Sequence, residues 1–485
     1  MAHSMSRPGR QPAGSFTHSG AKFTIQLAPG AIRFTMTRDG LSATYNAEYV
    51  IGSGAHAYGF LVRAGNYLFQ APVSYYSNRR LWDVAPGYED DPQPDFSRPV
   101  SAECLQCHAG HPKAVPATLN RYDPLPSADD AISCDRCHGD AGAHARNPSR
   151  NNIINPRRLP PRARDSVCEQ CHLSGEVRVP NPGRQFSDFH PGKDLEEVFT
   201  VYVRDRSAFS PASPIKVVSH AEQLAWSTCA RKSGGKLWCG TCHNPHEATQ
   251  NRLQRYRTRC LGCHGESVMR THSKPADDCV SCHMPKRKAK DGAHTVFTDH
   301  RISRTARAAQ ESPAREPVRK LVAWREPADL LKERNLGLAS VEVGERDRSP
   351  ELLDEGARLL IAAMKVTPPD PVVLTKLGLV LLRKQMAGDA VEVLEYVLKL
   401  EPDRGGSHAN LGLAYKEAGM TAKAVAEFER AIQLDPSLET AYRALGEIYM
   451  AENDLERVRG IFQRYLAFMP TNLSARKTLA ELPAR

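Results

Sequence analysis

The sequence repeats one pentapeptide, Cys-x-x-Cys-His, six times between residues 104 and 283. Twelve of the thirteen cysteines lie in these copies. The six cysteine pairs are Cys104 and Cys107, Cys134 and Cys137, Cys168 and Cys171, Cys239 and Cys242, Cys260 and Cys263, and Cys279 and Cys282. The histidines that follow them are His108, His138, His172, His243, His264 and His283. Each copy has to fold around whatever its two thiols and its imidazole bind, so these motifs constrain the fold more than any other feature.

Two thiols three residues apart can each form a thioether with one porphyrin, and the next histidine is then held beneath the iron as its proximal ligand. The six copies, numbered motif 1 to motif 6 along the chain, therefore predict six covalently attached c-type haems. Zinc sites, iron–sulfur sites and redox pairs also begin with Cys-x-x-Cys, but none of them requires a histidine after every second cysteine. A disulfide framework would not repeat the histidine either.

A bis-histidine haem needs a second, distal imidazole, and the chain has eighteen histidines for six irons. Setting aside the N-terminal tail and the C-terminal repeats leaves nine non-proximal candidates: His56, His111, His144, His190, His220, His246, His272, His294 and His300. His111 and His246 each follow a proximal histidine by three residues, so each can reach a neighbouring haem but not the far side of its own. His18 is a further candidate near the N-terminus and ranks with His111 and His272 below the others.

The formal net charge is +10. A bis-histidine haem carries roughly −1 when ferric and −2 when ferrous, so we expect Lys and Arg to neutralise propionates and expect no nucleic-acid partner. No stretch approaches the roughly 20 apolar residues of a membrane span. Covalent haem attachment takes place outside the cytoplasmic membrane, which predicts the periplasm or the cell surface. The first ten residues contain no apolar signal segment, so we expect a start placed too late or a trimmed chain.

The patterning predicts several regions ahead of the C-terminal repeats. Residues 1–22 read as a disordered tail, and alternating apolar residues over 23–99 predict a small antiparallel β region. Residues 100–305 hold all six motifs at about 30 residues per haem, too few to bury the macrocycles separately. We therefore expect haems packed against one another, with short helices and long loops. Residues 306–330 read as a basic linker.

Residues 331–485 carry a 34-residue period. Glycines recur at 378, 412 and 446, and prolines recur at 368, 402, 436 and 470. The unit with Leu411-Gly412, Tyr415, Ala424, Phe428 and Pro436 resembles the tetratricopeptide repeat, which implies an α–α superhelix. The chain ends soon after a partial helix, so we expect the C-terminal cap to be incomplete or supplied by a partner. The predicted fold class is mainly α, with the small β region ahead of the haem module.

The region 45–300 resembles the multihaem cytochrome c family, of the c-552/c-554-like type, that is often joined to tetratricopeptide repeats and is related to the tetrahaem cytochromes of ammonia oxidation and the pentahaem nitrite reductases. The resemblance rests on YVIGSGAHAYGF, LFQAPVSYY, WDVAPGYE, CHGDAGAH, SHAEQL, CGTCHNPH, CVSCHMP and AHTVFTDHRI. It implies that His144, His246, His294 and His300 are distal ligands. His56 and His220 lie in similarly placed segments, whereas His190 matches none.

These patterns favour an electron carrier whose closely packed haems form a wire and whose repeats dock a redox partner. The nitrite reductases attach their catalytic haem through a motif ending in lysine, whereas all six motifs here end in histidine. A reductase or oxidase of a small nitrogen or sulfur compound, acting at an open haem, is the first alternative. A cytochrome filament is the second, and the oligomeric state stays open. Met284 cannot reach the far side of its own haem. Cys229, outside the motifs, reads either as a buried thiol or as a group for intermolecular pairing or haem contact.

Overall fold

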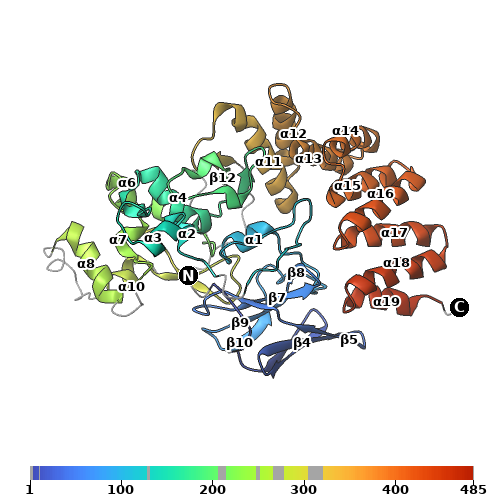
Figure 1. Ribbon diagram of the computed structural model, residues 1–485, viewed down its shortest axis with the longest axis horizontal. Coiled ribbons are helices and arrows are strands. Elements are labelled where there is room, and N and C mark those ends of the chain that lie inside the picture. The colour runs from blue at the N-terminus through green and yellow to red at the C-terminus, as the bar shows by residue number, and fades with distance from the viewer. Residues whose placement is uncertain are drawn as a thin grey trace. The chain divides into compact units, whose positions relative to one another are not determined.

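The computed structural model describes residues 4–9, 11–127, 131–205, 215–246, 252–265, 278–303 and 320–483. The chain folds into two compact units. Unit 1 comprises Ser133–Pro327, and unit 2 combines Ala2–Ile132 with Ala328–Arg485 (Figure 1). In the described part of the chain, no helix is long and apolar enough to cross a membrane.

Unit 2 begins with antiparallel sheets. One has four strands in chain order: β2 (Gly14–His18), β3 (Ala21–Ala28), β4 (Ala31–Arg38) and β5 (Leu41–Asn46). A second has the order β1 (Met5–Ser6), β6 (Tyr49–Ile51), β7 (Gly59–Ala64) and β8 (Tyr67–Gln70), and β9 (Val73–Tyr76) pairs with β10 (Leu81–Val84). Asp39 and Gly40 turn the chain between β4 and β5 with φ values of 51° and 77°, as a type I′ hairpin requires.

The β prediction holds, but the predicted disordered tail over 1–22 is wrong where β1, β2 and the start of β3 form. The tail contains polar and small residues that hide its alternation. Phe16 of β2 nevertheless stacks on Phe23 of β3 with ring centroids 4.9 Å apart. Cross-strand aromatic pairs of this kind stabilise a sheet edge. The fold is therefore a mixture of α and β, not mainly α.

The C-terminal part of unit 2 is an array of helical hairpins. Its helices are α11 (Asp329–Asp347), α12 (Pro350–Met364), α13 (Pro371–Arg383), α14 (Ala387–Leu400), α15 (Gly405–Glu417), α16 (Thr421–Leu434), α17 (Glu439–Ala451), α18 (Leu455–Phe468) and α19 (Leu473–Glu481). Helices α13, α15 and α17 begin 34 residues apart, in step with the sequence period. A Cβ added at Gly412 would lie 2.8 Å from the Phe428 ring, so this periodic glycine allows the two helices of its hairpin to pack closely.

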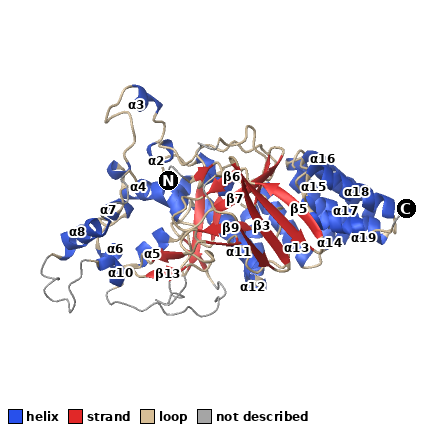
Figure 2. Cartoon of the chain, turned by 90° about the horizontal axis from the view of Figure 1, so that it is seen from below, coloured by secondary structure: helices blue, strands red, loops and turns tan. Residues whose placement is uncertain are grey.

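The last helices of this array pack against the sheets of the same unit, and both contribute to one hydrophobic core (Figure 2). The Phe468 ring of α18 lies 5.2 Å from the Tyr67 ring, and the Tyr45 hydroxyl donates to the Thr471 carbonyl at 2.5 Å. Lys477 of α19 forms an ion pair with Asp39 at 2.7 Å. The expectation of an incomplete or partner-supplied cap is therefore wrong, since the chain's own β region covers this end.

Unit 1 is built from short elements joined by long loops. Its helices are α2 (Asp135–His138), α3 (Gly142–Arg146), α4 (Pro161–His172), α5 (His220–Trp226), α6 (Thr228–Lys232), α7 (Cys239–Cys242), α8 (Arg252–His264) and α10 (Cys279–His283), with 3₁₀ turns η1 (Pro156–Arg158), η2 (Phe186–Asp188) and η3 (Leu195–Glu197). Its strands are β11 (Val177–Pro180), β12 (Phe199–Arg204), β13 (Lys286–Lys288), β14 (Val296–Thr298) and β15 (Leu321–Ala323). Strand β15 pairs with β12 although it lies inside the predicted linker 306–330, of which residues 306–319 fall outside the described residues.

The first motif does not share a unit with the other five. Helix α1 (Ala102–Gln106) buries Leu105 in a cluster with Tyr49 and Leu68 of the β region, and Ala109 joins the same cluster. The predicted single module over 100–305 is thus divided after residue 132, because the apolar side chains around motif 1 pack onto the sheet.

Candidate haem centres

Every Cys-x-x-Cys-His motif lies on a short helix or at the end of one. Motif 1 is on α1 and the residues just after it, motif 2 on α2, motif 3 at the end of α4, motif 4 on α7, motif 5 at the end of α8, and motif 6 on α10. Residues three or four apart face the same side of a helix, so one turn brings both thiols and the following imidazole together. None of the thirteen cysteines forms a disulfide, so both thiols of every motif are available for thioether formation.

Three proximal histidines each lie beside a distal candidate from another part of unit 1. The ring centroids of His138 and His246 are 5.7 Å apart. Those of His172 and His220 are 5.4 Å apart, and those of His243 and His300 are 6.1 Å apart. These pairs join motifs 2, 3 and 4 to segments far away in the sequence.

The separations fit a shared metal ion. An imidazole nitrogen binds a metal at about 2 Å, so two imidazoles on opposite sides of one ion have ring centroids roughly 6 Å apart. His220 and His300 are also close to each other, with centroids 4.9 Å apart. Motifs 3 and 4 therefore meet around a cluster of four imidazoles, and the residues present fit iron ligation.

Backbone carbonyls orient several of these rings. The Nδ1 atoms of His138 and His283 lie 2.6 Å from the Ile154 and Ser303 carbonyl oxygens. A carbonyl only accepts hydrogen bonds, so each Nδ1 carries the hydrogen and each Nε2 keeps the lone pair that binds a metal. The Nδ1 of His300 lies 2.9 Å from the carbonyl oxygen of Thr298 and has the same assignment.

Burial keeps some imidazoles neutral. It lowers the pKa of His108 in motif 1 and of His300. The neutral imidazole is the form that binds iron, because a protonated ring has no free lone pair. The Ser4 hydroxyl donates to the His108 carbonyl at 2.7 Å, which holds motif 1 against the first strands.

The other distal candidates lie on separate segments of the two units. His56 lies between β6 and β7, 3.1 Å from the Asn78 amide, and His144 lies on α3 with its Nδ1 3.0 Å from the Ser149 carbonyl oxygen. His18 ends β2, and His294 precedes β14. His111 is exposed after α1, and His190 is exposed after η2. His272 lies outside the described residues.

The thiols of different motifs are also neighbours. A hydrogen bond from the Cys168 thiol lowers the pKa of the Cys239 thiol, which places motifs 3 and 4 side by side. Burial, together with the nearby Cys279 sulfur, raises the pKa of Cys260 to about 11. Cys229 contributes to the same shift, so this half-buried thiol lies near Cys260 of motif 5.

A cavity of about 480 Å³ opens beside Cys239. Trp226, Trp238 and Trp324 line it, which are three of the four tryptophans of the chain. On its wall, Arg325 forms an ion pair with Glu169 at 2.7 Å. Sequence reasoning missed Trp324 and Arg325, because both lie in the predicted linker. The signal that could have found them is the short apolar run Leu321–Trp324 within a basic segment.

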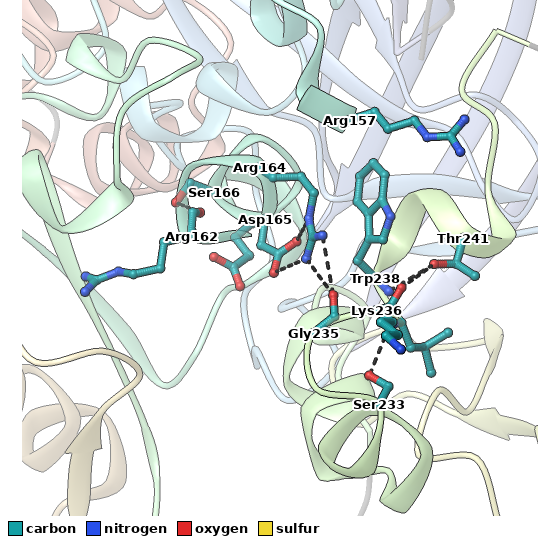
Figure 3. A network of polar contacts seen from close by, with 12 residues as sticks. Arg157, Arg162, Arg164, Asp165, Ser166, Ser233, Gly235, Lys236, Trp238 and Thr241 are labelled. Carbon is teal, nitrogen blue, oxygen red and sulfur yellow. Dashed lines mark hydrogen bonds and ion pairs between the residues drawn. The ribbon is translucent and has the colours of Figure 1, made fainter. Parts of the chain in front are cut away.

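Polar contacts tie the α4 motif helix to the segment before motif 4 (Figure 3). The Arg164 guanidinium donates to Asp165 at 2.8 Å and to the Gly235 carbonyl at 3.4 Å. It also lies over the Trp238 ring, 4.8 Å from its centroid. The side chain of Arg164 thus fixes the approach of α4 to α7.

Comparisons with known proteins identify two short segments. Residues 231–269 match the doubled CXXCH motif, and residues 406–438 match the tetratricopeptide repeat. No curated protein matches the chain.

Solved structures resemble a part of the chain. MamA from Desulfovibrio magneticus RS-1 shares 22% identity, with 30% of this chain and 77% of that chain covered and a TM-score of 0.26. MamA AMB-1 shares 25% identity, with 32% and 80% covered and a TM-score of 0.26. YrrB, a TPR protein with an unusual peptide-binding site, shares 17% identity, with 31% and 80% covered and the same TM-score. The chain thus combines a doubled motif for c-type haem with a tetratricopeptide repeat.

Proposed function

We propose that this protein is a multihaem c-type cytochrome that conducts electrons among six bis-histidine haems. The observation that carries the proposal is the approach of three proximal histidines to three distal candidates at separations of 5.4 to 6.1 Å. Haem iron held by two imidazoles cycles between the ferric and ferrous states without an open position for substrate, which is the chemistry of electron transfer.

The ring contacts support three ligand pairs in this proposal. They are His138 with His246, His172 with His220, and His243 with His300. His56, His144 and His294 remain for motifs 1, 5 and 6, and His56 shares unit 2 with motif 1. The Nδ1 hydrogen bonds to backbone carbonyls orient each ring and make Nε2 the donor to iron.

The neighbouring motifs supply a path between redox centres. The Cys168 thiol is near enough to lower the pKa of the Cys239 thiol, and the His220 and His300 ring centroids are 4.9 Å apart. Groups attached at motifs 3 and 4 are therefore close together, and electron tunnelling requires such closeness. Cys260 and Cys279 bring motifs 5 and 6 together in the same way.

We also propose a location and a partner. Covalent haem attachment places the protein in the periplasm or on the cell surface. The repeats would dock a redox partner protein, since stacked helical hairpins present an extended surface to a ligand. Docking is best tested by substitutions on that surface, because removing the repeats would expose the Tyr67 and Phe69 side chains that pack on Phe468.

The test is electron paramagnetic resonance of the oxidised holoprotein, combined with haem quantification by pyridine haemochrome and intact mass. We expect six haems and only low-spin ferric signals. Fewer than six attached haems would contradict the cofactor proposal. A stoichiometric high-spin signal would instead favour the reductase or oxidase, because an open iron is what such an enzyme needs.

A further inference from the structure

The net positive charge of the chain is concentrated in unit 1. Residues 133–327 contain 33 Lys and Arg against 20 Asp and Glu, a net charge of +13. The whole chain carries +10, so the remaining residues carry −3. The basic character of the protein thus belongs to the unit with five haem motifs, not to the repeats.

Haem propionates do not cancel this charge. Five bis-histidine haems at roughly −1 each when ferric would leave about +8, and at roughly −2 each when ferrous would leave about +3. Unit 1 therefore stays positive in both redox states, and its basic side chains exceed those needed to neutralise propionates.

Part of this excess lies around motifs 4 to 6. Residues 228–264 contain seven Lys and Arg and a single Glu. Helices α7 and α10 both pack against α8 (Figure 1), and β13 begins three residues after α10 ends (Figure 2). We define the basic face as five exposed cations close to these motifs in the chain: Lys232 at the end of α6, Lys236 before α7, Arg259 of α8, and Lys286 and Lys288 of β13.

The cations of the basic face are available to a partner. In the described residues, no carboxylate forms an ion pair with any of the five. By contrast, Arg287 of the same strand is paired with Asp299 at 2.9 Å and is largely buried. An exposed like-charged cluster repels itself and attracts an anionic surface, and this attraction raises the association rate at low ionic strength.

Motif 5 lies within the basic face. It ends α8, and both Cys263 and His264 are exposed. Arg259 precedes the first cysteine of this motif by one residue. A docked protein on this face would therefore lie next to a redox centre that is close to solvent, as electron exchange between two proteins requires.

We propose that the basic face is the docking surface for a redox protein with an acidic surface, which exchanges electrons at motif 5. This inference rests on the proposed function and adds a second docking surface besides the repeats. Its partner is a protein, since the cations lie on two helices, a loop and a strand beside three motifs and do not follow a single amphipathic helix, as a membrane-surface anchor would.

The test uses the full-length holoprotein and two probes in stopped-flow mixing. The first probe is a reduced flavodoxin chosen for its net negative charge, which gives up one electron per encounter. The second is a reduced cytochrome c chosen for its net positive charge. The test variant is Lys286→Glu with Lys288→Glu. The matched control is Arg184→Glu with Lys193→Glu, which changes the net charge of unit 1 equally at exposed sites elsewhere.

We expect the second-order rate constant with flavodoxin to fall about tenfold in the test variant at low ionic strength, and the difference to vanish in 0.5 M salt. The control should change the rate by less than twofold, and the basic probe should react slowly throughout. Equal losses in the test and control variants would overturn the proposal. So would unchanged rates accompanied by shifted haem midpoint potentials, which would assign the lysines to propionates.

Two further measurements distinguish a protein partner from a membrane surface, and a failure of docking from a failure of electron transfer. Loss of co-sedimentation with phosphatidylglycerol vesicles in the test variant, with the flavodoxin rate unchanged, would overturn the proposal in favour of a membrane surface. Reduction of all haems by dithionite must still occur in every variant. If dithionite reduces none of them even in the parent protein, the proposed electron-transfer function fails, and this result differs from any effect of docking.

Discussion

Replacing His246 by alanine tests the ligand pairs most directly. The His246 ring lies 5.7 Å from the His138 ring, close to the roughly 6 Å expected for two imidazoles on one ion. His246 is exposed in the loop after α7, so its truncation removes no core contact. The iron of motif 2 should lose its sixth ligand while the other five keep theirs.

The expected magnitude follows from the number of motifs. About one sixth of the ferric haem should change from low-spin to high-spin in electron paramagnetic resonance and in the optical spectrum, with haem content unchanged. Free imidazole should restore the low-spin signal, because it can occupy the vacant coordination position. The matched control is His190→Ala, which removes an exposed histidine after η2 that lies in no predicted ligand segment. Retention of six low-spin haems in His246→Ala, or the same high-spin signal in the control, would refute the pairing.

Three further predictions concern unit 2. Gly412→Ala should destabilise unit 2 by about 1–3 kcal/mol in urea denaturation, because the new Cβ would lie 2.8 Å from the buried Phe428 ring. Gly406→Ala on the same helix is the control: its Cβ would meet no atom within 4 Å, so this substitution should be neutral or stabilising. Burial raises the pKa of Glu439, so the stability that this carboxyl contributes is present at low pH and is lost as the pH rises through its folded-state pKa. Glu439→Gln should therefore flatten the dependence of the free energy of unfolding on pH. The same pH dependence in the variant and the parent protein, measured by urea denaturation between pH 4 and 8, would contradict this prediction. Phe468→Ala should lower the stability of unit 2 by about 2 kcal/mol, because it removes a half-buried ring from the contact between the repeats and the sheet. It should also speed amide hydrogen exchange in α18 and α19. Exchange protection equal to that of the parent protein would argue against the contact.

Local patterns account for the parts of the fold that were predicted well. The 34-residue period places a glycine wherever two helices of a hairpin meet, as at Gly412, and the hairpins begin in step with it. Alternating apolar residues from Phe23 to Met36 face one side of a sheet, and all of these side chains except Leu27 are buried. The strand alternation repeats every two residues and the helical repeat every 34, and both can be read along the chain without knowledge of distant contacts.

The predictions of a disordered tail and of a linker were wrong because distant contacts determine the structure of those segments. Strand β2 forms in a polar tail because β3 offers it a partner, and β15 forms in a basic segment because β12 does. Trp324 then packs beside α4 and donates to Glu169 at 3.2 Å. Neither pairing leaves a strong pattern in the strand itself, since β2 is short and largely polar and β15 has only three residues within a basic segment.

The sequence by itself determined the haem chemistry of this protein, because two thiols and an imidazole within five residues are brought together by a single helical turn. It also determined the repeats, whose period is local. Only the tertiary structure decided which second histidine approaches which motif, as with His300 beside His243, and that the β region covers the end of the repeats. Those outcomes depend on segments that are far apart along the chain and meet only when the core has formed, so no local pattern contains them.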